Sequence, residues 1–233
     1  MCWNFNISII SAIYGMIVSY YLYIRGRKRD KYYSRYLFTF TFTQIIDAML
    51  WYTNDNIEEL KECSIYQFQI LNYPKNNQVY NYFITKLLLP ISVFFQYAMQ
   101  CLYPSNLLSK YQKKFLIFIY LIPTICMSIS FGCTILYQSN FPINHYTLLW
   151  GGDLSKPSII VNEIVALIHS GLITLIFYLL MKKEKKILLI HVIPFYTIIL
   201  FLFITEGTIT LGSKWCWYCL IYSVIYITEP LWY

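Results

Sequence analysis

An aspartate and a glutamine lie inside an apolar stretch of the chain, within the segment TQIIDAMLW at positions 43–51. Gln44, Asp47 and Trp51 are spaced three and four residues apart, so they share one face if the segment is an α-helix. A charged group is expensive inside a membrane, and we therefore expect Asp47 to face the interior of a helix bundle and to have a partner there. Such a carboxyl group could serve a ligand, an ion or a proton.

Further polar residues lie in or beside other apolar stretches, and counting residues along each stretch estimates their depth. By this count Gln96 and His169 reach the level of Asp47, whereas Glu163 and Glu206 lie nearer the outer side. A polar column could therefore lead from the two glutamates to Asp47. The alternative is that these side chains hold helices together, at about 0.6 kcal/mol for each contact. For Asp47 and His169 both interpretations stand; for Gln44 and Gln96 we favour helix packing.

Tyrosines and cysteines give weaker signals. Tyr218, Tyr222 and Tyr226 follow one another at four-residue steps and form a stripe on one helical face, which indicates packing or the wall of a ligand site. The pair Cys63 and Cys216 falls on the predicted outer side and could form a disulfide if that side is oxidising. Cys101, Cys126 and Cys133 are expected to be small packing residues.

The composition is that of a membrane protein. Hydrophobic residues make up 58% of the chain and charged residues only 12%, against about 25% charged residues in soluble domains. The net charge of +7 could suggest a nucleic-acid partner, but the basic residues are concentrated in three short clusters. Membrane orientation explains such clusters better, so we expect no nucleic-acid partner.

Seven stretches approach the length of about 20 apolar residues that a helix needs to cross a bilayer. They cover residues 7–24, 36–52, 79–103, 115–137, 158–181, 187–205 and 215–232. Pro90, Pro123 and Pro194 lie inside them and are expected to kink the helices. We therefore predict an all-α fold, a single seven-helix transmembrane domain over residues 1–233.

The connections between these stretches differ in charge, which predicts an orientation. Basic residues gather in the first, third and fifth connections, at 25–35, 110–114 and 182–186. Acidic residues gather in the second connection, which contains Asp55, Glu58, Glu59 and Glu62. Because basic loops stay cytoplasmic, the N-terminus is predicted outside and the C-terminus cytoplasmic.

Known seven-span families are a poor match. The last stretch has no central lysine for retinal, and the Asp-Arg-Tyr and Asn-Pro-x-x-Tyr motifs of G-protein-coupled receptors are absent. The chain also has no Gly-x-Ser-x-Gly nucleophile motif and no His-x-x-x-His pair.

One resemblance rests on four short motifs in the second to seventh stretches: Gln44-x-x-Asp47-x-x-x-Trp51, Pro90 to Gln96, His145 to Trp150, and Trp215-Cys216-Trp217. In these motifs the chain resembles an uncharacterised family of multi-span membrane proteins found in giant DNA viruses. Asp47 stands where that family has Glu, and Tyr97 where it has Pro. The resemblance implies a protein of a host or viral membrane and brings no established activity.

These observations favour an integral membrane protein of the binding or transport type. Its buried polar site, formed by Asp47, Gln96 and His169, would take a small or lipid-like ligand or a proton, and the lipid bilayer is its surrounding partner. One alternative is a structural or assembly protein of a cellular or viral membrane. Another is an intramembrane lipid-modifying enzyme with Asp47 and His169 as acid and base, which no nucleophile or metal cluster supports. No cofactor or metal is predicted, and the sequence does not determine the oligomeric state.

Overall fold

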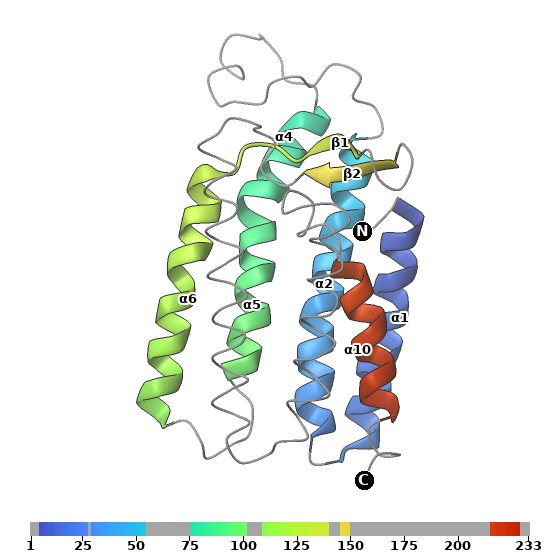
Figure 1. The fold of residues 1–233 in the computed structure, drawn as a ribbon, viewed down its shortest axis with the longest axis vertical. Helices are drawn as coiled ribbons and strands as arrows, with labels where there is room; N and C mark the ends of the chain where they lie inside the picture. The colour runs from blue at the N-terminus through green and yellow to red at the C-terminus, as the bar shows by residue number, and fades with distance from the viewer. Residues whose placement is uncertain are drawn as a thin grey trace.

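The computed structural model describes residues 5–27, 29–54, 76–101, 109–139, 145–149 and 215–228, which form helices and one β-hairpin (Figure 1). The helices are α1 (Phe5–Arg25), α2 (Asp30–Asn54), α4 (Asn76–Phe83), the π-helix η1 (Ile84–Leu88), α5 (Leu89–Cys101), α6 (Lys110–Ser130) and α10 (Trp215–Thr228). The hairpin consists of the antiparallel strands β1 (Ile135–Ser139) and β2 (His145–Leu149).

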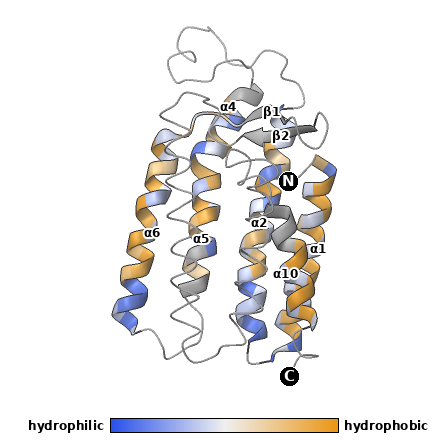
Figure 2. Ribbon diagram, in the orientation of Figure 1, coloured by the Kyte–Doolittle hydropathy of each residue, from blue (hydrophilic) through white to orange (hydrophobic). Residues whose placement is uncertain are grey.

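The long helices lie side by side along the long axis of the molecule (Figure 1). α2 contacts α1, α5 and α10, and α6 packs on the far side of α5. We call one end of this bundle the basic end, where α1 ends and α2 and α6 begin. Figure 2 shows hydrophilic residues at the starts of α2 and α6 there. The opposite end carries β1 and β2 and is called the hairpin end.

The contact between α1 and α2 depends on small residues. The buried face of α1 includes Ser8, Ser11, Gly15 and Ser19, whose small size lets the two backbones approach closely. Ser19 Oγ donates a 2.8 Å hydrogen bond to the carbonyl oxygen of Ser34 in α2, which pins the register of the two helices.

A glycine makes the tight turn between these two helices possible. Gly26 has a φ of 66°, in the left-handed region, and its amide donates to the carbonyl of Leu22 at 3.2 Å. The amide of Asp30 donates to the carbonyl of Arg27 at 2.9 Å and starts α2. A side chain at position 26 would strain this turn, because residues other than glycine rarely adopt a positive φ.

A π-helical turn precedes Pro90, the first of the three prolines that lie inside predicted membrane-spanning stretches. Helix α4 continues through η1 into α5, so residues 76–101 form one continuous helical rod with Pro90 in the first turn of α5. Because proline has no amide hydrogen and its ring crowds the preceding turn, the wider π-helical turn relieves this conflict. Pro123 lies inside α6, as expected, whereas Pro194 is outside the described residues.

Most predicted stretches in the described part of the chain are helices, with changed ends. Residues 7–24 lie in α1, 36–52 in α2, 79–101 in α4 to α5, and 215–228 in α10. The stretches at 158–181 and 187–205 lie outside the described residues. Two of the helices, α1 and α6, are long and apolar enough to cross a membrane.

The predicted helix at 115–137 is wrong in its last third. α6 ends at Ser130, Phe131 has an extended conformation with ψ of 133°, and Ile135–Ser139 forms β1. Gly132 and the β-branched residues Thr134 and Ile135 follow the helix end and favour an extended chain over another helical turn. The all-α prediction holds for the bundle, and the structure adds a two-stranded hairpin at one end, in which His145 pairs with Ser139.

Beside its apolar core, the bundle also has exposed apolar side chains and buried polar ones. α6 exposes large apolar side chains, including Phe115 at 63%, Phe118 at 63% and Ile129 at 72%. By contrast, α2 buries Gln44 and Asp47 completely. Water-soluble folds place such residues the other way round.

Candidate buried polar site

Helix α2 carries the largest group of buried polar side chains among the described residues. Several of them are threonines that bond back to their own helix. Thr39 Oγ1 donates to the carbonyl of Tyr36 at 2.7 Å, and Thr41 Oγ1 donates to that of Leu37 at 2.9 Å. These hydroxyl groups are satisfied locally and need no partner on another helix.

Gln96 of α5 reaches α2 at Thr43. Gln96 Nε2 donates a hydrogen bond of 2.6 Å to Thr43 Oγ1, which lies 3.4 Å from the carbonyl of Thr39. Thr43 and Asp47 are four residues apart on α2, so they are neighbours on one helical face. The structure thus places Gln96 one helical turn from Asp47, in agreement with the depth estimated from residue counting.

Half of the Gln96 amide is left without a hydrogen bond. The side chain is 1% exposed, and its Oε1 accepts no hydrogen bond from any residue that the structure describes. Rotating the amide by 180° would exchange the two atoms, so that the nitrogen instead of the oxygen would lack a partner. A buried polar atom without a partner costs about 1–3 kcal/mol, so this acceptor is suited to a donor from a ligand or a water molecule.

Gln44, Asp47 and Trp51 share the buried side of α2, as their spacing predicts. Gln44 and Asp47 have no exposed surface, and Trp51 is 5% exposed. None of the three is without an interaction partner in the structure. His169, Glu163 and Glu206, the other members of the predicted column, lie outside the described residues.

Tyr222 lies in a different part of the bundle. Its ring packs edge-on against Tyr36 of α2, with 6.5 Å between ring centroids, and lies 5.6 Å from the ring of Tyr226. Tyr226 in turn stacks on Tyr33 at 4.1 Å. Because Tyr36 precedes Asp47 by three turns of α2, Tyr222 lies roughly 16 Å along the helix axis from Asp47. The contacts of Tyr222 are those of aromatic packing near the basic end.

A second buried polar cluster, at the hairpin end, escaped the sequence analysis. Asn81 Nδ2 donates to Thr53 Oγ1 at 3.1 Å and to the carbonyl of Thr134 at 3.0 Å. Asn81 Oδ1 accepts from the amide of Thr134 at 2.8 Å and from Thr85 Oγ1 at 3.3 Å. We call Asn81, Thr53, Thr85 and Thr134 the asparagine network; it joins α2, α4 and η1 to the segment after α6. The i, i+4 pair of Asn81 and Thr85 was the available sequence signal.

Cysteines near this end differ from the predicted packing role. Cys133 is completely buried and forms a disulfide, and Cys126 is an exposed free thiol on α6. Both predictions of a small packing residue are therefore wrong. The side chain of Cys101 lies outside the described part of the molecule.

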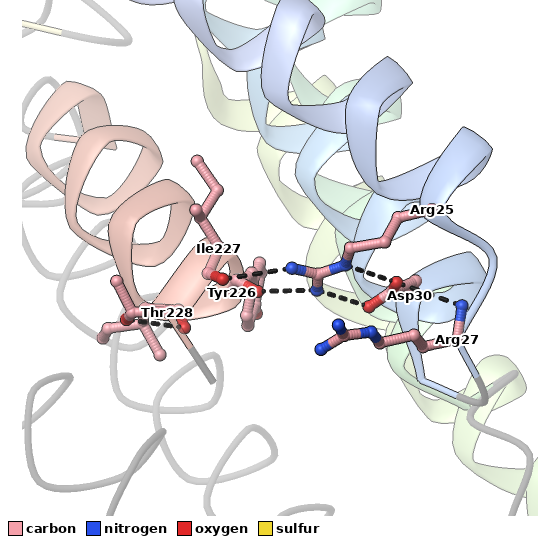
Figure 3. Close-up of polar contacts among 7 residues, drawn as sticks. Arg25, Arg27, Asp30, Tyr226, Ile227 and Thr228 are labelled. Atoms are coloured by element: carbon pink, nitrogen blue, oxygen red, sulfur yellow. Dashed lines mark hydrogen bonds and ion pairs between the residues drawn. The ribbon is translucent and has the colours of Figure 1, made fainter. Parts of the chain in front are cut away.

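Arg25 joins the first two helices to the last helix (Figure 3). Its Nε and Nη2 donate to the two carboxylate oxygens of Asp30, each at 2.7 Å. Its Nη1 and Nη2 also donate to the carbonyls of Ile227 and Tyr226, both at 3.0 Å. A cation at these last carbonyls of α10 satisfies groups that the helix itself leaves unpaired.

Burial and hydrogen bonding act in opposite directions on the pKa of Asp30. Burial, the largest influence, raises the pKa of this carboxyl group. The hydrogen bonds from the Arg25 side chain and the Arg27 amide, together with the charges of both arginines, outweigh burial and lower the pKa below its usual value. Asp30 is therefore a carboxylate at neutral pH.

The described residues contain no group of three or more His, Cys, Asp or Glu side chains that could hold a metal ion. No family model, curated protein or solved structure matches this chain. The resemblance to multi-span proteins of giant DNA viruses therefore stays a prediction.

Proposed function

We propose that this chain is a seven-helix integral membrane protein of the binding or transport type. Its N-terminus lies outside and its C-terminus in the cytoplasm. A buried polar site between α2 and α5, built by Gln44, Asp47 and Gln96 and completed by His169, takes a small or lipid-like ligand or a proton. If the viral resemblance holds, the membrane is that of a virus or its host.

The exposed apolar faces of the helices support membrane insertion. Ile10, Ile13 and Ile17 of α1 are 55–64% exposed, and α6 exposes a similar row of phenylalanine and isoleucine side chains. Apolar surfaces this large are rare on soluble monomers and mark contact with lipid or protein. Together with the two helices of membrane-spanning length, they support the assignment to a bilayer.

Chemical differences between the two ends support the orientation. Arg27, Lys31 and Arg35 lie at the basic end, where α1 ends and α2 begins. The disulfide-bonded Cys133 follows α6 at the hairpin end. Basic residues favour the cytoplasmic side, and disulfides form on the oxidising side of a membrane. Both observations agree with a cytoplasmic basic end.

The unsatisfied amide oxygen of Gln96 is the observation that carries the proposed site. Helix packing alone would favour a side chain whose two polar atoms are both paired, because an orphan acceptor lowers stability. Here the acceptor lies one helical turn from a buried carboxyl group. This arrangement provides an acceptor and an acidic group for a bound donor or a proton.

The test uses Asp47→Asn and Gln96→Leu in purified protein reconstituted into vesicles. Thr124→Val is the matched control, because it removes a hydroxyl group that bonds only within α6, away from the site. Proton flux is followed with a pH-sensitive dye inside the vesicles, and bound small molecules are extracted and identified by mass spectrometry. We expect the two site variants to fold and to lose flux or the bound molecule. Full flux and an unchanged bound molecule in Asp47→Asn would overturn the site.

A structural role in a cellular or viral membrane is the second candidate. It is favoured by the asparagine network, whose buried groups are paired with one another without a ligand. On this alternative, Asp47→Leu is tolerated or stabilising, and the purified protein carries no bound molecule and conducts no protons.

A further inference from the structure

One face of α2 is exposed along the whole helix. It is positively charged at the basic end and apolar toward the hairpin end. The exposed residues of this face are Lys31, Arg35, Phe38, Phe42, Met49 and Tyr52. Their steps of three, four and seven residues keep them in one row on the helix. Phe38 is 53% exposed, Phe42 39% and Met49 42%, so the other described residues leave much of the row uncovered.

Most of the cations beside this row form no ion pair with the acidic residues that the structure describes. Arg25 is engaged by Asp30 and by the end of α10. Within the described ranges, Arg27, Lys31 and Arg35 form no ion pair. The two acidic residues of these ranges, Asp30 and Asp47, are both buried. Within the described residues, Lys31 and Arg35 therefore present exposed positive charge, without an ion-pair partner, directly below an apolar row.

The dimensions of the row match one leaflet of a bilayer. Phe38 and Met49 are three helical turns apart, which corresponds to roughly 16 Å along the axis. Half of a hydrocarbon core about 30 Å thick is about 15 Å. Lys31 and Arg35 then lie at the level of the lipid headgroups, within reach of a phosphate.

The geometry points to a binding site for an anionic phospholipid on this face of α2. The headgroup phosphate lies between Lys31 and Arg35, with Arg27 nearby, and one acyl chain lies along Phe38, Phe42 and Met49. The inference depends on the membrane insertion proposed above and is independent of the site at Asp47. A second copy of the chain is a poorer occupant, since a symmetric contact through this row would bring like charges together.

A soluble phosphate compound would satisfy only part of this surface. The guanidinium of Arg35 can hold a phosphate through two parallel hydrogen bonds, which explains an anionic headgroup. The exposed aromatic and methionine side chains above it need an apolar partner, which a free phosphate lacks. A phospholipid has both an anionic headgroup for the cations and an acyl chain for the apolar residues beside them.

The test measures lipid selectivity of the full chain in vesicles by electron spin resonance. Spin-labelled phosphatidylglycerol and spin-labelled phosphatidylcholine are compared as probes in phosphatidylcholine vesicles. We expect wild-type protein to prefer the anionic probe about 25-fold, since Lys31 and Arg35 each contribute roughly fivefold. Lys31→Gln combined with Arg35→Gln should reduce the preference to about onefold to twofold.

Lys110→Gln combined with Lys114→Gln is the matched control. It removes two exposed positive charges from the same end of the molecule, on α6, and should keep most of the preference. Equal loss in both double variants would overturn the site, because selectivity would then follow net charge alone. Absence of any preference in the wild-type protein would overturn it as well.

Two further measurements separate the possible causes. Extraction of the vesicles with alkaline carbonate checks membrane insertion: protein that stays in the membrane without lipid preference overturns the lipid site and leaves the insertion proposal standing. Inorganic phosphate at millimolar concentration should not displace the labelled lipid. Complete displacement would mean that the surface binds phosphate without an acyl chain, which also overturns the proposal.

Discussion

Two buried polar regions of the bundle look alike in composition and differ in how well they are paired. In the asparagine network, the side-chain oxygen and nitrogen of Asn81 together take part in four hydrogen bonds. At the contact of α2 with α5, Gln96 has one hydrogen bond, to Thr43, and its Oε1 has none within the described residues. Burial is the same in both regions, so hydrogen-bond satisfaction is the property that separates a structural contact from a candidate site.

The largest effect is expected when the asparagine network is broken. Asn81→Leu keeps the branched shape of the side chain but removes the side-chain partners of the buried amide and carbonyl of Thr134. We expect the free energy of unfolding to fall by about 3 kcal/mol. Unfolding in mixed micelles with increasing denaturing detergent, followed by circular dichroism, measures the change. The control Thr124→Val removes one hydrogen bond within α6 and should lower the free energy of unfolding by about 1 kcal/mol or less. Equal losses in the two variants would show that the asparagine network contributes no more than an ordinary hydrogen bond.

The Arg25 contact should behave like the asparagine network, since its groups are also paired. Arg25→Gln leaves the buried carboxylate of Asp30 and two carbonyls of α10 without their cation. We expect a loss of about 2 kcal/mol, below the usual cost of a fully buried pair because Arg25 is partly exposed. The same unfolding assay applies, with Arg35→Gln as an exposed control that should change stability by less than about 0.5 kcal/mol.

The Asp30 pKa adds a pH dependence to this contact. Its pKa is lowered in the folded protein, so the carboxylate stabilises the fold at pH values above the unfolded pKa of about 4. This stabilisation is lost as the pH falls from there through the folded pKa. Wild-type protein should therefore lose stability below about pH 4 relative to Asp30→Asn, and the difference between them should be constant between pH 5 and 7. A difference that already shrinks between pH 7 and 5 would contradict the lowered pKa.

The smallest effect on stability is expected at the candidate site. Gln96→Leu removes one hydrogen bond to Thr43 and also removes an unpaired acceptor, and these two effects oppose each other. We expect stability to change by less than about 1 kcal/mol, while proton flux or ligand binding is lost. The unfolding assay and the vesicle assay are run on the same preparation. A loss of stability as large as that of Asn81→Leu would place Gln96 with the structural contacts and erase the difference between the two regions.

Local properties of the chain were predictable from the sequence. Helices α1, α2 and α10 follow from long apolar stretches, and the burial of Gln44, Asp47 and Trp51 follows from their shared helical face. The level of Gln96 relative to Asp47 came from counting residues at a fixed rise. Each of these inferences needs only the geometry of one helix and the thickness of a bilayer.

Contacts between distant segments were not predictable in the same way. The four bonds of Asn81 depend on a chain reversal after Ser130, where strand-forming residues end a stretch that hydropathy alone extends to residue 137. Tyr222 has the right residue type for a ligand wall, but it packs against Tyr36, three turns of α2 away from Asp47. The sequence indicates Arg25 only as one of several charges that set the orientation. Nothing nearby in the sequence shows that it donates hydrogen bonds to residues 226 and 227.

The Arg25 contact also bears on the order in which the molecule is completed. Arg25 and Asp30 are five residues apart and can pair as soon as the first turn has been made. The two carbonyls that share this guanidinium come about 200 positions later. The hairpin of α1 and α2 thus contains a preformed binding site for the end of α10. This contact can form only after α10 has been synthesised. A chain interrupted before that point would expose an arginine with two unused donors, a feature by which a cell could distinguish unfinished molecules from finished ones.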